Sequence, residues 1–233
     1  MATPTSPGVV SFLGPSFVNN IDALLDGSKW GGSRGTAATV TYSFAGDNSR
    51  YSTDFLTGYG PVTGDGEPWN GWGVLTAAQK VAVDAALDAW SAVARITFVK
   101  VVDSLTVAGD IRFAYSNAVS PFANAHAYLP ATTAYAGDVW LSHDIDGADF
   151  SMGSGGYFTV LHEIGHAAMG FVDVTPDFGL NGAFLSIALD SNQYTVMSYY
   201  VHEDGVTQGT DVFANEDHPT TPMWLDIQAA QYV

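Results

Sequence analysis

The chain has 233 residues, of which 47% are hydrophobic, and a formal net charge of −17. This apolar content can bury a sizeable core, so we expect a single domain over residues 1–233, and the absence of cysteine excludes a disulfide framework and thiol chemistry. The last lysine or arginine is Arg112, and the acidic half that follows would repel a phosphate backbone, which excludes nucleic acid as a partner.

The first part of the chain predicts one short helix, one strand and one long helix. Apolar side chains recur at helical spacing over residues 16–26 and stop at Gly27. Residues 40–44 alternate between apolar and polar side chains, as a half-buried strand does. Residues 58–73 have the glycine and proline content of a loop. Thr76 and Gln79 form a capping box, which predicts a helix reaching about Ala94.

The remaining elements complete an α+β pattern. We expect four more strands, over residues 96–101, 110–115, 125–129 and 137–141. An acidic, glycine-rich loop over residues 142–156 then leads into a helix that ends near Gly170. Residues 222–232 predict a final helix whose inward side chains are Trp224, Leu225, Ile227 and Ala230. This order favours a sheet packed on two main helices.

The helix before Gly170 carries the ligand spacing of a catalytic zinc site. His162 and His166 are four residues apart and lie on one helical face, with Glu163 beside the first. Catalytic zinc has three protein ligands and an open position for water, and a neighbouring carboxylate can take the proton of that water. Glu163 is placed for this role. The competing interpretation is a helix whose histidines only border the core.

A second motif points to a family. Residues 193–199 read Gln-Tyr-Thr-Val-Met-Ser-Tyr, and together with the histidine helix they resemble the serralysin-type metalloproteases of the metzincin group. In that family the Met-Ser-Tyr turn, the Met-turn, lies under the zinc; the methionine supports the metal floor, and the tyrosine ligates zinc and then stabilises the tetrahedral intermediate. Met197 and Tyr199 match these positions, although composition alone would make Met197 ordinary core.

The resemblance covers most of the chain. Residues 75–101 look like the family's first long helix and following strand, and residues 221–230 look like its closing helix. It implies a metzincin-like twisted mixed β-sheet packed on two long helices, with the active-site helix followed by the Met-turn and a C-terminal helix. Residues 125–130 and 137–141 look like the sheet edge above the cleft. Such an edge can take an extended protein or peptide substrate as an added strand, and we expect a monomer.

The third ligand departs from the family pattern. Metzincins place a glycine seven residues and a third histidine ten residues after the first histidine, but these positions are Met169 and Val172 here. Gly170 and Asp173 follow one residue late, which a single insertion would explain, and Asp173 would then ligate zinc through a carboxylate oxygen. Two alternatives stay open: another group, such as Asp177, as the ligand, or no third protein ligand.

The sequence contains four other histidines and one possible calcium-binding loop. We expect His126 to be a core or cleft residue, and His143, His202 and His218 to lie in loops. Residues 144–149 contain three aspartates in the manner of a short calcium loop, so calcium is a second candidate cofactor, although the distal glutamate of an EF-hand is missing.

The functional expectation is therefore a zinc-dependent endopeptidase with Glu163 as general base. The alternative is a non-proteolytic, metzincin-like peptide-binding or adhesion module with an incomplete metal site. A thermolysin-like arrangement is a third option, but no glutamate occurs between Glu163 and Glu203 to supply its downstream ligand.

Location follows from the resemblance. The N-terminus lacks the basic and apolar regions of a signal peptide, and no apolar run is long enough to span a bilayer. Serralysin relatives usually continue into calcium-binding repeats with a C-terminal export signal, whereas this chain stops at Val233. We expect an excised catalytic domain of an extracellular protein.

Overall fold

The computed structural model describes residues 2–62, 64–175, 178–201 and 218–233. Within these residues the elements run in the following order: β1 (Val10–Phe12), α1 (Asn19–Asp22), β2 (Ser28–Trp30), β3 (Ala38–Phe44), α2 (Ala77–Ser91), β4 (Ile96–Lys100), β5 (Ile111–Ser116), β6 (Ala125–Ala127), β7 (Val139–Ser142), the 3-10 helix η1 (His143–Ile145), α3 (Gly155–Met169), the 3-10 helix η2 (Leu180–Gly182) and α4 (Trp224–Tyr232). Helices and strands are both well represented, so the fold is mixed, as expected.

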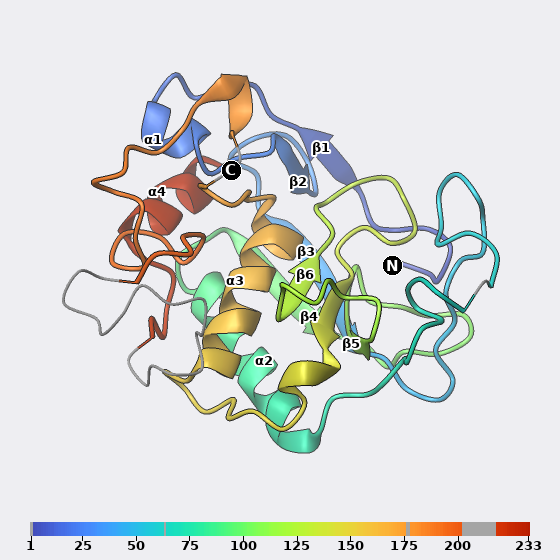
Figure 1. Cartoon of the computed structure of the whole chain (residues 1–233). Helices are drawn as coiled ribbons and strands as arrows, with labels where there is room; N and C mark the ends of the chain where they lie inside the picture. Colours follow the sequence, from blue (N-terminus) through green and yellow to red (C-terminus); the bar gives the residue numbers. More distant parts are fainter. Residues whose placement is uncertain (1, 63, 176–177, 202–217) are drawn as a thin grey trace.

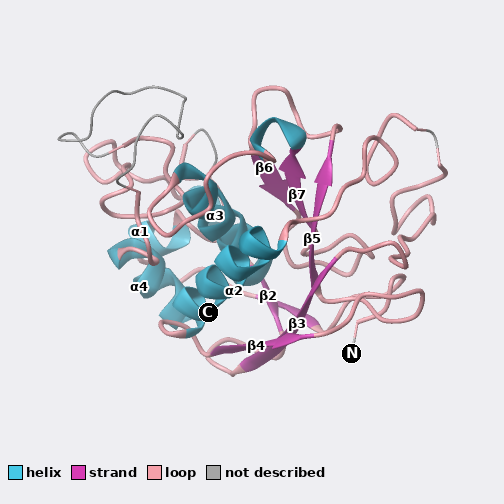
Figure 2. Cartoon of the chain, turned by 90° about the horizontal axis from the view of Figure 1, so that it is seen from below, coloured by secondary structure: helices cyan, strands magenta, loops and turns pink. Residues whose placement is uncertain are grey.

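The main sheet has five strands in the order β4-β3-β5-β7-β6. The first four strands are mutually parallel, and β6 pairs antiparallel with β7 at the edge, with Ala125 opposite Leu141 and Ala127 opposite Val139. The helices lie on one side of this sheet (Figure 2). The expected mixed sheet on two long helices is compatible with this arrangement, and the small β1-β2 pair was not predicted.

The two long helices pack against each other beneath the sheet. The capping box at the start of α2 is present, with Thr76 accepting from Gln79 N, and Val83 and Trp90 are buried on the inward face of that helix. The indole of Trp90 donates to Leu161 O on α3, 3.0 Å away. This bond fixes α3 against α2, which places the middle of α3 under β6 in the centre of the molecule (Figure 1).

The opposite face of the sheet carries a second apolar cluster. Arg112 and Asp138 form a buried, bidentate ion pair with distances of 2.8 and 2.7 Å, and Tyr59 OH donates to Asp138 at 2.7 Å. Arg112 also donates to Arg50 O. The cluster on this face contains six aromatic side chains: Tyr51, Tyr59, Trp69, Trp72, Tyr128 and Trp140. These contacts hold the long loop formed by residues 50–62 and 64–72 over the sheet, next to β6.

Two sequence expectations about helices were wrong in detail. The helix over residues 16–26 is only α1, because the side chain of Asp22 accepts the backbone N–H groups of Ser16 and Phe17 and holds these residues outside the helix. In α4, Trp224 is 52% exposed rather than inward, since it is the first residue of the helix, while Leu225 and Ala230 are buried as expected. Among the described helices, none is both long and apolar enough to cross a membrane.

A candidate metal centre in the cleft

The histidine helix is well defined at both ends. Ser154 caps the start of α3 by accepting from Tyr157 N, and Gly170 ends it in the left-handed conformation with φ of 66°. The indole of Trp30 donates to Ala167 O near the C-terminal end. These contacts hold a rigid helix, on which the Nε2 atoms of His162 and His166 lie 3.0 Å apart.

Backbone carbonyls orient both imidazoles. His162 Nδ1 lies 2.8 Å from Val196 O, and His166 Nδ1 lies 2.7 Å from Phe171 O. A carbonyl oxygen only accepts, so each Nδ1 carries a hydrogen and each neutral ring presents the lone pair of Nε2. Both lone pairs are directed to the same point in the cleft, which is the arrangement that metal-ligating histidines require.

A sharp reversal after α3 brings Asp173 to the same point. Gly170 is required here, because a Cβ at this residue would lie 2.2 Å from Ser28 O. The chain then runs beside residues 24–26, with Val172 N donating to Leu24 O. Asp173 Oδ1 consequently lies 3.1 Å from His162 Nε2 and 3.3 Å from His166 Nε2.

The donor set fits zinc. Tetrahedral zinc with nitrogen and oxygen ligands at about 2.0–2.1 Å holds those ligand atoms about 3.3 Å from one another. The three distances among His162 Nε2, His166 Nε2 and Asp173 Oδ1 are 3.0, 3.1 and 3.3 Å. Within the described residues, these three form the one group of histidine and carboxylate side chains that converges in this way.

In the metal-free protein, a proton on His162 can supply the positive charge that a bound metal would bring to the cluster. Burial would lower the pKa of His162, but the hydrogen bond to Asp173 and the charges of Glu163 and Asp173 raise it to about 9. Burial would likewise raise the pKa of Asp173, but the two imidazoles hold it well below its ordinary value. The cluster therefore favours a cation, either a proton on His162 or a metal ion.

Glu163 borders the open side of the centre. Its side chain is buried, and Oε2 accepts no hydrogen bond within the described part of the chain. Burial raises the pKa of Glu163, opposed by the positive charges of His162 and His166.

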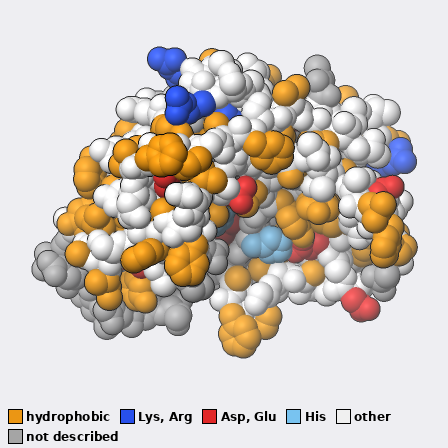
Figure 3. All heavy atoms as spheres, turned by 90° about the horizontal axis from the view of Figure 1, so that it is seen from above, with side chains coloured by type: hydrophobic (Ala, Val, Ile, Leu, Met, Phe, Trp, Pro, Cys, Tyr) orange, Lys and Arg blue, Asp and Glu red, His pale blue; other side chains and the backbone are white. Residues whose placement is uncertain are grey.

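Glu163 lines a cleft of about 240 Å³ together with Ala125, His126, Ala127, Leu129, His166, Phe171, Val172, Asp173 and Tyr199. In the space-filling view, histidine and acidic side chains reach the surface at a hollow in the middle of the molecule (Figure 3).

The Met-Ser-Tyr turn lies beneath α3. Met197 is fully buried, and a Cβ at Gly165 would lie 2.6 Å from its sulfur, so only glycine allows this approach of the turn to the helix. Val196 O is the carbonyl that orients His162. Met197 is thus part of the core, and the turn that contains it also sets the angle of one imidazole.

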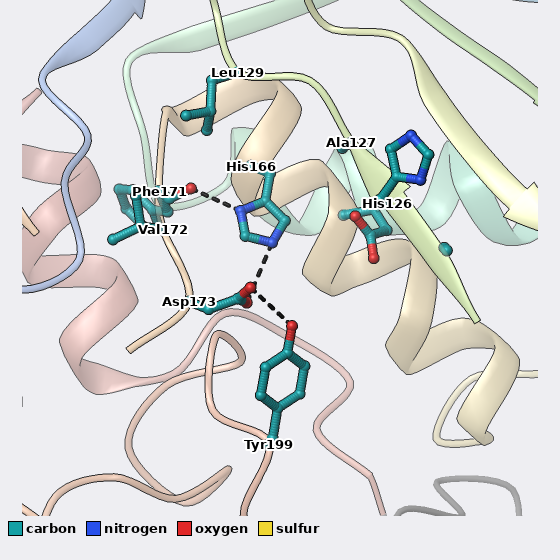
Figure 4. Close-up of a pocket in the computed structure, with 10 residues that line it drawn as sticks. His126, Ala127, Leu129, His166, Phe171, Val172, Asp173 and Tyr199 are labelled. Carbon is teal, nitrogen blue, oxygen red and sulfur yellow. Dashed lines mark hydrogen bonds and ion pairs between the residues drawn. The ribbon is translucent and has the colours of Figure 1, made fainter. Parts of the chain in front are cut away.

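Tyr199 reaches the other side of the cluster. Its hydroxyl donates to Asp173 Oδ2 at 2.7 Å, and its ring lies 5.6 Å from that of His162. Figure 4 shows His166, Asp173 and Tyr199 pointing toward one another. The structure therefore brings together all five residues proposed from sequence for the site: Glu163, Tyr199, His162, His166 and Asp173.

Two buried carboxylates in the neighbourhood were not identified from sequence. Asp226 accepts from Thr195 Oγ1 at 2.5 Å and from Val196 N at 2.8 Å. Asp190 accepts from the hydroxyls of Thr175 and Ser198, and so joins the segment after Asp173 to the turn before Tyr199. The available signal was the pair of hydroxyl residues flanking Met197, because buried hydroxyls require partners.

The other sequence candidates lie away from the centre or outside the described residues. His143 begins η1 and bonds to Gly71 O, while His218 is buried against Phe158. Asp177, the alternative third ligand, and His202 lie outside the described residues.

The suggested calcium loop does not gather its carboxylates. Asp149 accepts from the backbone and hydroxyl of Ser151, and Asp146 pairs with His143 at 3.5 Å. Within the described residues, the three aspartates of residues 144–149 do not converge on a common point.

Comparison with known proteins gives relatives of one kind. No family model matches the chain. The chain is 30% identical to serralysin of Proteus mirabilis over 226 residues, which is 88% of this chain and 42% of that protein. It is 28% identical to serralysin of Photorhabdus sp. (strain Az29), over 72% of this chain and 36% of the relative. With serralysin A of Dickeya chrysanthemi the identity is 26%, over 88% and 40%. The chain thus spans about two fifths of the length of the curated relatives it matches.

Proposed function

We propose that this chain is a serralysin-like, zinc-dependent endopeptidase. The observation that carries the proposal is the convergence of His162 Nε2, His166 Nε2 and Asp173 Oδ1 at the spacing of zinc ligands, beside a buried glutamate and under β6, the edge strand of the sheet. Similarity to serralysins over most of the chain supports it. The family, the single catalytic domain and the extracellular location are parts of this proposal.

His162, His166 and Asp173 would hold the metal, with Tyr199 as a further ligand at rest. Zinc, when bound, supplies Lewis-acid polarisation and acidifies water. Glu163 accepts the proton of the attacking water and delivers it to the leaving amine, and burial, which raises the pKa of its carboxyl, suits both steps. Tyr199 OH, which donates to Asp173 beside the two histidines, would donate to the developing oxyanion once it leaves Asp173.

The substrate would bind as an added strand on β6. Ser142 N donates to Asn124 O and Tyr128 N donates to Asp138 O, so alternate residues of this segment bond to β7. The backbone groups of Ala125 and Ala127 then face away from β7 and offer a peptide its hydrogen bonds. Ala125, Ala127 and Glu163 line the same cleft, which supports a bound peptide bond lying within reach of the base.

Hydrolysis of an unfolded protein tests the proposal. The zinc-loaded chain is expected to cleave casein, a chelator to abolish cleavage, and added zinc to restore it. Glu163→Gln is expected to lower the rate by about a hundred- to ten-thousandfold, since it removes the proton carrier, and to retain zinc. Asp88→Asn, a matched change of an exposed carboxylate on α2, should leave the rate unchanged.

A different outcome would favour the second candidate function. If the folded, zinc-loaded chain is inert on several unfolded substrates but binds them, it is a peptide-binding module. If zinc does not bind at all, the endopeptidase proposal is wrong.

A further inference from the structure

A buried glutamate holds the one histidine of the edge strand. Glu67, in the loop that packs on the outer face of the sheet, has a side chain only 6% exposed, and its Oε2 lies 3.2 Å from His126 Nε2. Tyr128 OH donates to the same oxygen at 3.2 Å. His126 itself is 37% exposed and lines the cleft. Glu67 therefore anchors an imidazole that remains accessible to a bound molecule.

The strand register fixes the direction of His126. It lies opposite Trp140, whose side chain belongs to the cluster on the outer face of the sheet, away from α3. Directly paired residues share a face, so His126 projects to that outer face as well. Figure 4 shows its ring on β6 turned away from His166, Asp173 and Tyr199. His126 thus forms an upper wall of the cleft and is not part of the metal centre.

A peptide added along the outer edge of β6 would bring one of its side chains close to His126. Because the alternate residues 124, 126 and 128 bond to β7, His126 is a non-hydrogen-bonded position toward a strand added on the other side. In antiparallel pairs, side chains at such positions approach most closely, with Cα atoms about 4.5 Å apart. One side chain of a bound peptide would therefore face His126, while the side chains before and after it point to the other face.

The chemistry of this position favours a negative group. A carboxylate accepts from His126 Nε2, and within the described residues Nδ1 has no hydrogen bond, so Nδ1–H remains available in the charged ring. Burial would lower the pKa of His126, but the hydrogen bond and charge of Glu67, with the charge of Glu163, raise it above its ordinary value. Since Glu67 is buried behind the ring, a substrate meets the imidazolium rather than the carboxylate.

We propose that His126, held by Glu67, is a specificity-determining residue that favours a glutamate or aspartate side chain at the peptide position opposite it. This inference rests on the proposed endopeptidase function and on substrate binding along β6. It predicts an acidic preference at one position only, because the neighbouring positions face away from His126.

A glutamate scan of a peptide substrate tests the proposal. One cleavable peptide is made in a series in which a single glutamate, or a matched glutamine, is placed at each position in turn, and the ratio of kcat/KM for the two is measured. We expect about a five- to tenfold preference for glutamate at one position, the range of a partly exposed, charge-assisted hydrogen bond. His126→Gln should reduce that ratio to about one, and Glu67→Gln should lower it. His143→Gln, a matched change outside the cleft, should leave it intact.

Binding to the Glu163→Gln variant, followed by fluorescence anisotropy of labelled peptides, provides a second readout that does not depend on turnover. The same glutamate preference should appear there and disappear with His126→Gln. Cleavage without a preferred glutamate position, or a preference that survives His126→Gln, would overturn this inference alone. Loss of all cleavage in the wild-type, zinc-loaded chain would instead overturn the proposed function.

Discussion

The two halves of the candidate metal centre are held in different ways. His162 and His166 stand on α3, a regular helix capped by Ser154 and ended by Gly170. Asp173 and Tyr199 stand on irregular segments, which Asp190 joins through the hydroxyls of Thr175 and Ser198. Asp226 holds the turn before Tyr199 through Thr195 and Val196. The helix distributes its stability over many equivalent bonds, whereas the irregular half depends on a few. We therefore expect small changes in the irregular half to have the larger effects on the metal.

The largest expected effect follows removal of Asp173. Asp173→Ala should lower zinc affinity by at least about a hundredfold, because loss of a ligand exceeds the 10- to 100-fold cost of losing a ligand's hydrogen-bond partner. Zinc content after dialysis against a competing chelator measures this. Unchanged zinc content in the purified variant would show that Asp173 is not a zinc ligand. It would also contradict the expectation that changes in the irregular half have the larger effects on the metal.

The metal-free protein should show a pH dependence that links the halves. The pKa of His162 is raised from 6.5 to about 9; burial opposes this rise, and the hydrogen bond to Asp173 drives it. The ion pair of protonated His162 and Asp173 then contributes at most about 3 kcal/mol to the free energy of unfolding. This contribution is fully present below about pH 6.5 and is lost as pH rises through 9. Urea unfolding of chelator-treated protein from pH 6 to 10 measures it. Asp173→Ala should flatten the profile, and a flat wild-type profile would contradict the coupling.

Asp190 offers a direct comparison with the helix cap. Asp190→Ala leaves the buried hydroxyl of Ser198 and the partly buried hydroxyl of Thr175 without their acceptor and should cost about 2–3 kcal/mol. Ser154→Ala at the start of α3 should cost about 1 kcal/mol. Asp190→Ala should also weaken zinc binding, with partial rescue by Asp190→Asn. Equal zinc affinities for the Asp190→Ala and Ser154→Ala variants would show that Asp190 stabilises the fold without positioning the site.

The smallest effect tests the contact between the halves. Gly165→Ala places a methyl group 2.6 Å from the sulfur of Met197 and 3.3 Å from the ring of Trp90, so the turn must shift, at a cost of about 1–2 kcal/mol. Gly147→Ala, where a Cβ meets nothing within 4 Å, is the matched control. Thermal unfolding of both variants compares them, and equal melting temperatures would show that the turn adapts freely.

Sequence alone predicted the regular half well. Helical spacing and the capping box located α2, and the His-Glu-x-x-His pattern with Gly170 located α3 and its end. Strand alternation found every strand of the main sheet. Each of these helices and strands has a hydrophobic period or a defined cap, so residues close together in the sequence are enough to predict it.

The irregular half could be predicted only in part. Resemblance to the metzincin pattern suggested both Asp173 and Tyr199. Nothing local indicated that Asp190 joins their segments or that Asp226 holds the turn before Tyr199, because those contacts connect residues apart in sequence. The same limit applies to Glu67, whose partner His126 lies on another element. The helix over residues 16–26 was overextended because apolar spacing continues while the side chain of Asp22 holds its first residues in a turn.

A crystal structure of the zinc-loaded chain, with anomalous scattering measured at the zinc edge, tests the metal centre most directly. We predict one zinc peak bound by Nε2 of His162, Nε2 of His166 and a carboxylate oxygen of Asp173, with Glu163 beside the open position. A peak that lacks Asp173 among its ligands, or no peak at the histidine pair, would contradict this centre.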